Sequence, residues 1–220
     1  MKRMTFATAT AVVALAAAGV ATGVHAADLI VDEPAAAVVA PADHNIYALL
    51  YGGVALGGVI NWYDDAGDFY TDYDYTAGWA LGGAIGIGTG IAGLSVEADV
   101  FHTHREYDGS GTYPVDTTSL MANLKYTLSL NDVFDVYAGA GVGGIHLSYV
   151  NGDPADVYSG WGLGYQVMVG ASANVADNVA IFGELRYQNT FSPVTVDIDS
   201  SYYSLEVPTT AVLVGIKLSM

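Results

Sequence analysis

Apolar residues alternate with polar or small residues along most of the chain from Ile46 onward. The clearest run is Ala92 to His102, in which Val96 and Val100 share one parity while Glu97 and Asp99 share the other. Successive side chains of a β-strand point to opposite faces, so this period of two predicts a strand with one apolar and one polar face. The other runs of this kind lie at 46–63, 77–88, 118–129, 134–150, 158–173, from 179 onward and at the end of the chain.

The connections between these eight runs alternate strictly between short and long. The short ones are Thr89-Gly90, Asn131-Asp132 and Asn174 to Asn178, and the long ones cover 64–76, 103–115, 151–157 and 191–203. An even number of long antiparallel strands with all long loops at one end is typical of an outer-membrane barrel. Such a barrel must be closed, because an open strand edge in lipid leaves backbone groups unpaired. The sequence therefore predicts an all-β, eight-stranded antiparallel up-and-down transmembrane β-barrel.

Charged side chains indicate which face of each strand points inward. A Lys or Arg facing lipid at the bilayer midplane costs about 2 to 4 kcal/mol, so the charged parity is expected to face the barrel interior. This rule predicts a structural polar network made of Glu97, Asp99, Lys125, Glu184, Arg186 and Lys217. Loops that turn at Gly111 and at Ser200-Ser201 would pair Glu97 with Lys125 and Glu184 with Lys217. An eight-stranded interior is just wide enough for side chains to fill it, so a packed plug is expected, with a narrow ion or proton path as the alternative.

Aromatic residues gather near both ends of the expected strands. This placement is typical of the interfacial girdles of membrane barrels. The group next to the long loops comprises Trp62, Tyr63, Trp79, Tyr149, Tyr158, Trp161 and Tyr187, and the group at the other end comprises Tyr47, Tyr126, Phe134 and Tyr137.

The first 45 residues differ in composition from the rest of the chain. Lys2 and Arg3 precede an apolar run that ends in Val24-His25-Ala26, which predicts a secretory signal peptide at 1–26. Residues 27–45 show no periodicity and are expected to be a flexible periplasmic lead-in, followed by the barrel domain at 46–220. An uncleaved membrane anchor is the alternative to the signal peptide.

Composition removes several classes of function. The net charge of −17 makes nucleic acid an unsuitable partner. The chain has no Cys, which excludes disulfides, thiolate chemistry and Cys-ligated metals. Apolar residues make up 52% and charged residues only 13%, so most of the chain is not disordered.

Three segments resemble the small outer-membrane β-barrel family of Gram-negative bacteria. They are Asp135–Gly144, Gly162–Ala171 and Asp177–Tyr187, the last with an Asp-Asn turn before Glu184-Leu-Arg186-Tyr187. The resemblance is to the porin-family group related to OmpA transmembrane domains and opacity proteins, especially alphaproteobacterial surface proteins. It implies insertion by the outer-membrane assembly machinery and contact with outer-membrane lipid and lipopolysaccharide. The family's usual terminal aromatic residue is replaced by Met220.

Candidate chemistry is sparse. The first long loop, Asp64 to Tyr75, interleaves acids with aromatic residues, which favours a solvated acidic loop over a Ca²⁺ or Mg²⁺ site. His102 and His104 share one strand face, and a His with Ser119 and Glu106 imitates the arrangement of a lipid A deacylase barrel. No spacing orients a nucleophile toward its base, so no catalytic, cofactor or metal site is expected.

The sequence thus favours a non-enzymatic structural or surface protein that presents acidic, Tyr-rich external loops to an unidentified extracellular ligand. A small porin-like pore and an outer-leaflet lipid A-modifying enzyme are the functional alternatives. At the level of the fold, the alternative is a soluble secreted calycin-like barrel.

Overall fold

A computed structural model describes residues 38–39, 45–64, 66–109, 113–150, 157–198 and 201–220. All of them belong to one compact unit, 36–220. The expected signal peptide, 1–26, lies outside the described residues, as does most of the expected lead-in, 27–45. Of that lead-in, Val38–Val39 forms the short strand β1, which pairs with the end of β7 at Leu128 and Ser129.

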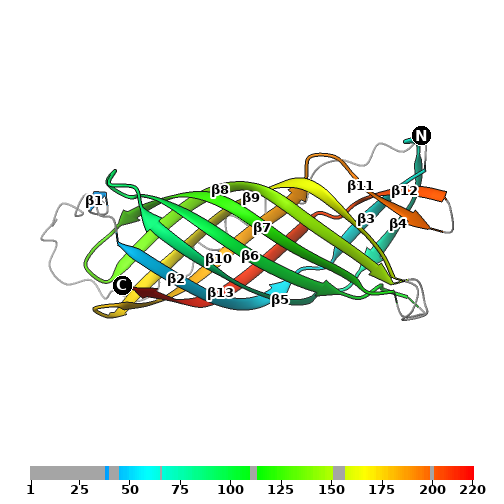
Figure 1. Ribbon diagram of the computed structural model, residues 1–220. Coiled ribbons are helices and arrows are strands. Elements are labelled where there is room, and N and C mark those ends of the chain that lie inside the picture. The colour runs from blue at the N-terminus through cyan, green and yellow to red at the C-terminus, as the bar shows by residue number, and fades with distance from the viewer. Residues whose placement is uncertain (1–37, 40–44, 65, 110–112, 151–156, 199–200) are drawn as a thin grey trace, which may run out of the picture. The chain divides into compact units, whose positions relative to one another are not determined.

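Eight antiparallel strands close into a barrel (Figure 1). Neighbouring strands pair in the order β2, β5, β6, β7, β8, β9, β10, β13, and β13 pairs back with β2. This arrangement confirms the predicted fold class. The barrel strands are β2 (Ile46–Ala55), β5 (Gly78–Gly88), β6 (Leu94–Arg105), β7 (Val115–Ser129), β8 (Phe134–Val150), β9 (Val157–Ala176), β10 (Val179–Thr190) and β13 (Thr209–Ser219).

Short turns join the strands at one end of the barrel, as their residues predict. Gly90 and Gly93 have φ values of 79° and 75° in the connection between β5 and β6, a region that side chains with a Cβ rarely adopt. In the next turn the Asn131 carboxamide oxygen accepts hydrogen bonds from the backbone N–H groups of Val133 and Phe134, each at 2.9 Å. Local hydrogen bonding of this kind explains why Asn is favoured in turns.

The long loops at the other end contain more structure than the sequence predicted. Four strands form a second sheet in the order β11, β12, β3, β4. Its strands are β3 (Gly58–Tyr63), β4 (Phe69–Tyr75), β11 (Val194–Ile198) and β12 (Ser201–Glu206). We call this the outer sheet; it is made of two hairpins that extend past the barrel strands (Figure 1).

The expected single strand 46–63 was wrong, because the chain is interrupted at Leu56-Gly57 between β2 and β3. Gly57 explains the local geometry: a Cβ there would lie 2.6 Å from the backbone oxygen of Tyr75. The missing side chain lets the chain pass close to the end of β4 as it leaves the barrel for the outer sheet.

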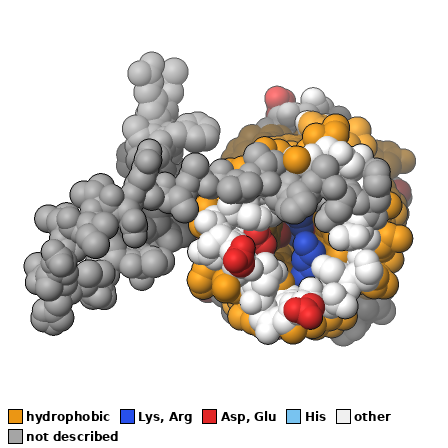
Figure 2. Space-filling view, turned by 90° about the vertical axis from the view of Figure 1, so that its left-hand side faces the viewer, with side chains coloured by type: hydrophobic (Ala, Val, Ile, Leu, Met, Phe, Trp, Pro, Cys, Tyr) orange, Lys and Arg blue, Asp and Glu red, His pale blue; other side chains and the backbone are white. Residues whose placement is uncertain are grey.

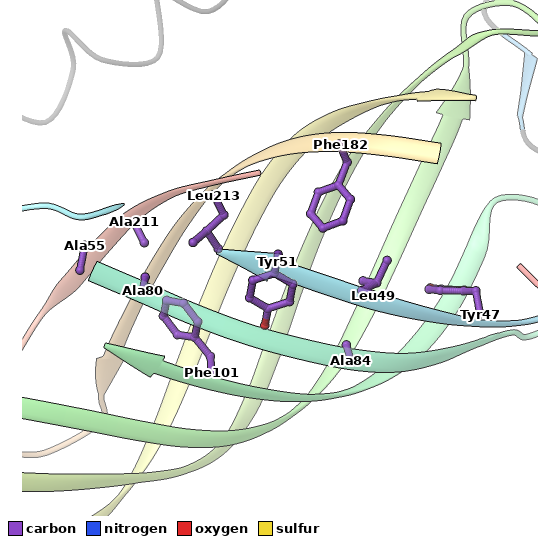
Figure 3. Packing of buried hydrophobic residues seen from close by; sticks show 10 residues of the cluster. All are labelled: Tyr47, Leu49, Tyr51, Ala55, Ala80, Ala84, Phe101, Phe182, Ala211 and Leu213. Atoms are coloured by element: carbon purple, nitrogen blue, oxygen red, sulfur yellow. The ribbon is translucent and has the colours of Figure 1, made fainter. Parts of the chain in front are cut away.

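The alternation of side chains separates an apolar exterior from a filled interior. Leu124 and Val214 on the outer face are 50% and 66% exposed, whereas Asp99 on the inner face is fully buried. One buried apolar cluster comes from β2, β5, β6, β10 and β13, whose side chains project into the barrel (Figure 3). No helix that could cross a membrane is present in the part of the chain that the structure describes.

Candidate functional site

A buried ion-pair group crosses the middle of the barrel. Arg186 on β10 lies 3.0 Å from Asp99 on β6 and 2.8 Å from Glu184, two residues away on its own strand. The Tyr51 hydroxyl lies 2.5 Å from Asp99 and accepts a hydrogen bond from Arg186 at 2.9 Å. Burial of a charge is costly unless the charge is paired and hydrogen-bonded, and here both conditions are met.

A second ion pair lies nearer to the short turns. The Lys125 ammonium contacts the Glu97 carboxylate, and the Tyr47 hydroxyl lies 2.8 Å from that carboxylate. Gly86 on β5 gives the Tyr47 ring its space, since a Cβ at Gly86 would lie 2.3 Å from the ring. The Lys217 ammonium lies 4.5 Å from the centroid of the same ring, a cation–π distance.

The strand register corrects the two predicted cross-strand pairs. Glu97 lies opposite Asn123, two residues from the predicted position, although the Lys125 side chain still reaches it. Glu184 lies opposite Leu213, four residues from Lys217, so the predicted Glu184–Lys217 pair was wrong. The positions of the turns could not be determined from the sequence pattern, and a shift of the turn by one residue moves every cross-strand partner.

A hydrogen-bonded amide layer adjoins the ion pairs and includes residues that sequence reasoning missed. Gln166 donates to Asn123 at 2.6 Å and accepts from Gln188 at 3.1 Å, and Gln188 also donates to Ser119 at 2.9 Å. Gln166 falls inside a Gly-rich run whose alternation is weak. Its register with Gly141 on β8 and Gln188 on β10 places it on the inward face.

Arg105 falls in the predicted long connection 103–115, but it is the last residue of β6 and points into the barrel, where it is only 1% exposed. It donates to the backbone oxygen of Pro208 at 3.2 Å and to the Thr209 hydroxyl at 3.1 Å, while its Nε has no partner. The sequence could have predicted this orientation, because Arg105 is separated from Glu97 and Asp99 by an even number of residues along the strand and therefore lies on the same face of β6. The rule that charge points inward applies to it as well.

An apolar and aromatic cluster closes the outer end of the barrel. Trp62 packs edge-on against Tyr149 at 5.1 Å and Tyr73 at 5.9 Å between ring centroids. Burial raises the pKa of the Tyr75 phenol in the same cluster. We call this group the outer cluster; its buried members are Ile60, Trp62, Tyr75, Val115, Leu147, Tyr149, Val194, Val196 and Leu205.

The opposite end of the barrel opens into a small polar mouth. A cavity of about 250 Å³ is lined by Lys125, Lys217, Asp135 and other polar residues. Figure 2 looks into this end and shows basic side chains inside the hollow, with apolar side chains around the outer wall. The mouth therefore ends at the ion pairs described above.

The aromatic residues divide between wall and interior, which corrects the predicted girdles. Trp79 and Trp161 at the outer end are 51% and 68% exposed on the outward face, and Tyr126 and Phe134 at the other end are 42% and 52% exposed. Other members of the two predicted groups instead fill the interior or its outer closure. These are Tyr47, Trp62 and Tyr149, which are buried, and Tyr137, which packs against the buried cluster.

The arrangement imagined for a lipid A deacylase is not assembled. Ser119 faces the interior and accepts from Gln188, whereas His102 and His104 occupy outward positions of β6. The His104 Nδ1 atom lies 2.7 Å from an Asp116 carboxylate oxygen, and the His102 Nδ1 atom lies 2.8 Å from the Thr118 hydroxyl. Among the described residues, no group of three His, Cys, Asp or Glu side chains could hold a metal ion.

The expected acidic loop forms the hairpin of β3 and β4. The Asp64 carboxylate accepts backbone N–H groups of Ala66 and Asp68 at 3.0 and 2.9 Å, which stabilises the turn. Nearby, the Tyr63 hydroxyl donates to Glu206 at 3.3 Å. Desolvation and the Glu206 carboxylate raise the pKa of Tyr63.

Comparisons with known proteins agree with this geometry. A family model described as "Outer membrane protein beta-barrel domain" matches residues 6–216. The comparison with curated protein sequences gave no match.

Three solved structures share the fold at low identity. Neisserial surface protein A matches with a TM-score of 0.54 at 15% identity, covering 79% of this chain and 96% of that one. OprG from Pseudomonas aeruginosa matches with 0.55 at 12% identity, covering 82% and 98%. The outer membrane protease OmpT from Escherichia coli matches with 0.51 at 12% identity, covering 80% and 97%. The alphaproteobacterial origin expected from the resemblance stays a prediction.

Proposed function

The chain belongs to the outer membrane protein beta-barrel family, and on that premise we propose that it is a closed anchor that presents the outer sheet to the cell's surroundings. The family and the fold place the protein in the outer membrane. We also propose that the outer-membrane assembly machinery inserts it and that lipid and lipopolysaccharide surround its wall.

The observation that carries this proposal is the exposure of aromatic side chains on the outer sheet. Phe69 and Tyr70 are each 61% exposed on β4, and Tyr202 is 58% exposed on β12. Exposed aromatic groups that gather in one region are typical of an interaction surface, because large apolar groups are otherwise costly to leave in water. These rings lie on a sheet of four strands whose backbones are hydrogen-bonded to one another, which holds them more rigidly than an irregular loop would.

The filled interior supports an anchor over a pore. A water path would have to pass the Asp99–Arg186–Glu184 group and then the outer cluster. Eight strands leave an interior that side chains can fill completely. The pore is therefore the second candidate, and the polar mouth with Lys125 and Lys217 is the feature that favours it.

An enzymatic role has less support. One structural neighbour is a protease, but at 12% identity the likeness concerns the fold alone. Among the described residues, Ser119 faces the interior while His102 and His104 occupy outward positions of β6, so this serine and these histidines do not form a nucleophile–base pair.

Single-channel recording of the refolded mature protein in a planar bilayer separates anchor from pore. We expect no discrete steps from protein whose folding is verified by its heat-dependent shift in gel mobility. Reproducible steps would establish a conducting path and overturn the anchor proposal.

The surface role is tested with whole cells. A Phe69→Ser/Tyr70→Ser variant should reach the outer membrane at normal levels but reduce retention of cells on an apolar surface such as polystyrene. The matched control is Leu130→Ser, which removes an exposed apolar residue at the opposite, short-turn end. Equal retention of both variants and the wild type would contradict a role for the outer sheet.

A further inference from the structure

Two adjacent rows of side chains on the outward wall differ from the apolar rows beneath them. Both rows run across β5 to β9, at the end of the barrel from which the outer sheet extends. Strand pairing aligns the first row as Leu81, His102, Thr118, His146 and Trp161, and the second as Trp79, His104, Asp116, Ser148 and Ser159. We call the three histidines with Asp116 and the two tryptophans the histidine belt.

The members of the belt contact one another. The His104 Nδ1 atom lies 2.7 Å from Asp116, and the His102 Nε2 atom lies 3.7 Å from the same carboxylate oxygen. The Trp79 ring lies 5.1 Å from the His102 ring and 5.6 Å from the His104 ring, in the second case nearly parallel. On the other side of the belt, the His146 ring lies 5.0 Å from the Trp161 ring.

The belt lies at the edge of the apolar band of the wall. The next row toward the middle contains Val100, Leu120 and Leu163, which are 51%, 59% and 66% exposed. Tryptophan is enriched where hydrocarbon meets the lipid headgroups. The imidazoles beside Trp79 and Trp161 are therefore at headgroup depth, on the side of the membrane that carries the outer sheet.

No Lys or Arg of the described residues faces outward on the wall. Arg105, Lys125, Arg186 and Lys217 all occupy inward positions of their strands. Histidine is the side chain whose charge changes between pH 5 and 8. The belt histidines are therefore the wall's own source of positive charge toward the headgroups.

Protonation reverses the charge of the belt. The acidic member of the belt is Asp116 on β7, and the acidic side chain next to the belt is Glu106, which lies 3.9 Å from His104 Nε2. The residues that flank the histidines from β5, β8 and β9 are Trp79, Leu81, Ser148, Ser159 and Trp161, none of which carries charge. The belt together with Glu106 carries −2 with neutral imidazoles and +1 with three imidazolium ions.

We propose that the protonated histidine belt binds the phosphate groups of the outer-leaflet glycolipid, lipid A, and releases them as pH rises. The proposal rests on the outer-membrane location and goes beyond the role of the outer sheet. Imidazolium N–H groups donate to phosphate oxygens, and the flanking tryptophans lie along the sugar and upper acyl region of the lipid. Basic groups at headgroup depth are the usual means by which proteins recognise anionic lipid.

The test uses the mature protein in phosphatidylcholine nanodiscs that contain a small fraction of lipid A. Phosphorus NMR of the lipid A phosphates reports binding at pH 5.5 and pH 8. We expect on the order of tenfold tighter binding at pH 5.5, as three weak exposed ion pairs together supply. The H102Q/H104Q/H146Q variant should lose this pH dependence, and the H102R/H104R/H146R variant should bind at both pH values.

Several outcomes overturn the proposal. Binding by the wild type that does not change with pH would do so, as would an unaltered pH response in the glutamine variant. Equal binding of phosphatidylglycerol in place of lipid A would replace the lipid A assignment with attraction to any anionic headgroup. The heat-dependent shift in gel mobility confirms that each variant is folded. Bilayer recording of the glutamine variant shows whether it conducts, so a failure of the lipid A proposal can be distinguished from a failure of the anchor proposal.

Discussion

Glu97 and Asp99 lie two residues apart on β6, yet each is neutralised from a different strand. Lys125 on β7 contacts Glu97, and Arg186 on β10 contacts Asp99. The energetic value of such pairs is asymmetric. A buried ion pair stabilises the fold little more than apolar packing would, whereas removal of one partner leaves the other charge buried and unpaired. At the scale of the residue, each carboxylate therefore depends on one identified base.

Lys125→Met is expected to lower the free energy of unfolding in detergent by about 3 to 5 kcal/mol, because it leaves Glu97 buried without its partner. Chemical unfolding followed by tryptophan fluorescence measures the change. The control is the double variant Glu97→Gln/Lys125→Met, which removes both charges and should recover much of the loss. A single variant as stable as the wild type would mean that Glu97 is hydrated or paired elsewhere.

At the scale of the element, the two faces of each strand meet different surroundings. On β7, Asn123 and Lys125 are buried while Leu120 and Leu124 are exposed. The exposed residues of this wall are apolar because the surrounding medium in the outer membrane is hydrocarbon. A charged side chain on the outer face destabilises the barrel, and the free-energy cost depends on its depth in the bilayer. On the inner face the same charge can be paired with another buried group.

Leu124→Arg should destabilise the folded protein in a lipid bilayer by about 2 to 4 kcal/mol and lower its level in the outer membrane, since it places a charge in the apolar band. Leu130→Arg is the depth control: Leu130 lies at the turn after β7 and is also exposed, so about 0 to 1 kcal/mol is expected there. Quantitative membrane fractionation and unfolding in bilayers measure both variants. Normal levels of the Leu124 variant would contradict the face assignment.

The outer sheet differs from the barrel strands because its strands are paired outside the membrane, where unpaired backbone groups could bind water instead. Trp62 contacts Tyr73, Tyr149 and Tyr203, which joins β3 to β4, β8 and β12. Its indole N–H is buried without a partner. Aromatic packing thus joins the two hairpins to each other and to the end of the barrel.

At the scale of the whole molecule, two closures lie in series along the barrel. The ion-pair group fills the middle, and the outer cluster covers the outer end. Opening either closure alone leaves the other in place. The interior therefore differs from that of a pore with one constriction.

Removal of the central charges by Asp99→Ala/Glu184→Ala/Arg186→Ala should leave the barrel silent in planar bilayers. Because all three charged groups are removed together, no buried charge is left unpaired, and the variant is expected to fold. Addition of Gln166→Ala, Gln188→Ala, Trp62→Ala and Tyr149→Ala should produce discrete conductance steps, because the amide layer beside the central group and the outer cluster are then removed as well. Steps from the triple variant alone would show that the outer cluster does not seal the barrel, and silence of the combined variant would locate the barrier elsewhere.

The sequence by itself determined that eight strands form a closed barrel and which face of these strands points inward. Alternation at period two separates Glu97 and Asp99 from Val96 and Val100, and the cost of charge in lipid then decides which set faces inward. The same argument assigned the interior positions of Lys125, Glu184, Arg186 and Lys217 without knowledge of any contact. Local pattern suffices for these features because each depends only on a strand and its surrounding medium.

The tertiary structure alone decided which interior groups meet. The partner of Glu184 is Arg186 and not Lys217, because strand register depends on how each hairpin turns. Arg105 is buried because β6 continues its alternation three residues past His102, where the predicted run ended. The hairpins of the outer sheet and the alignment of His102, Thr118 and His146 arise in the same way, from pairing between distant segments. Such pairing depends on how the strands are aligned across the closed barrel. This alignment cannot be deduced from the order of residues along one strand.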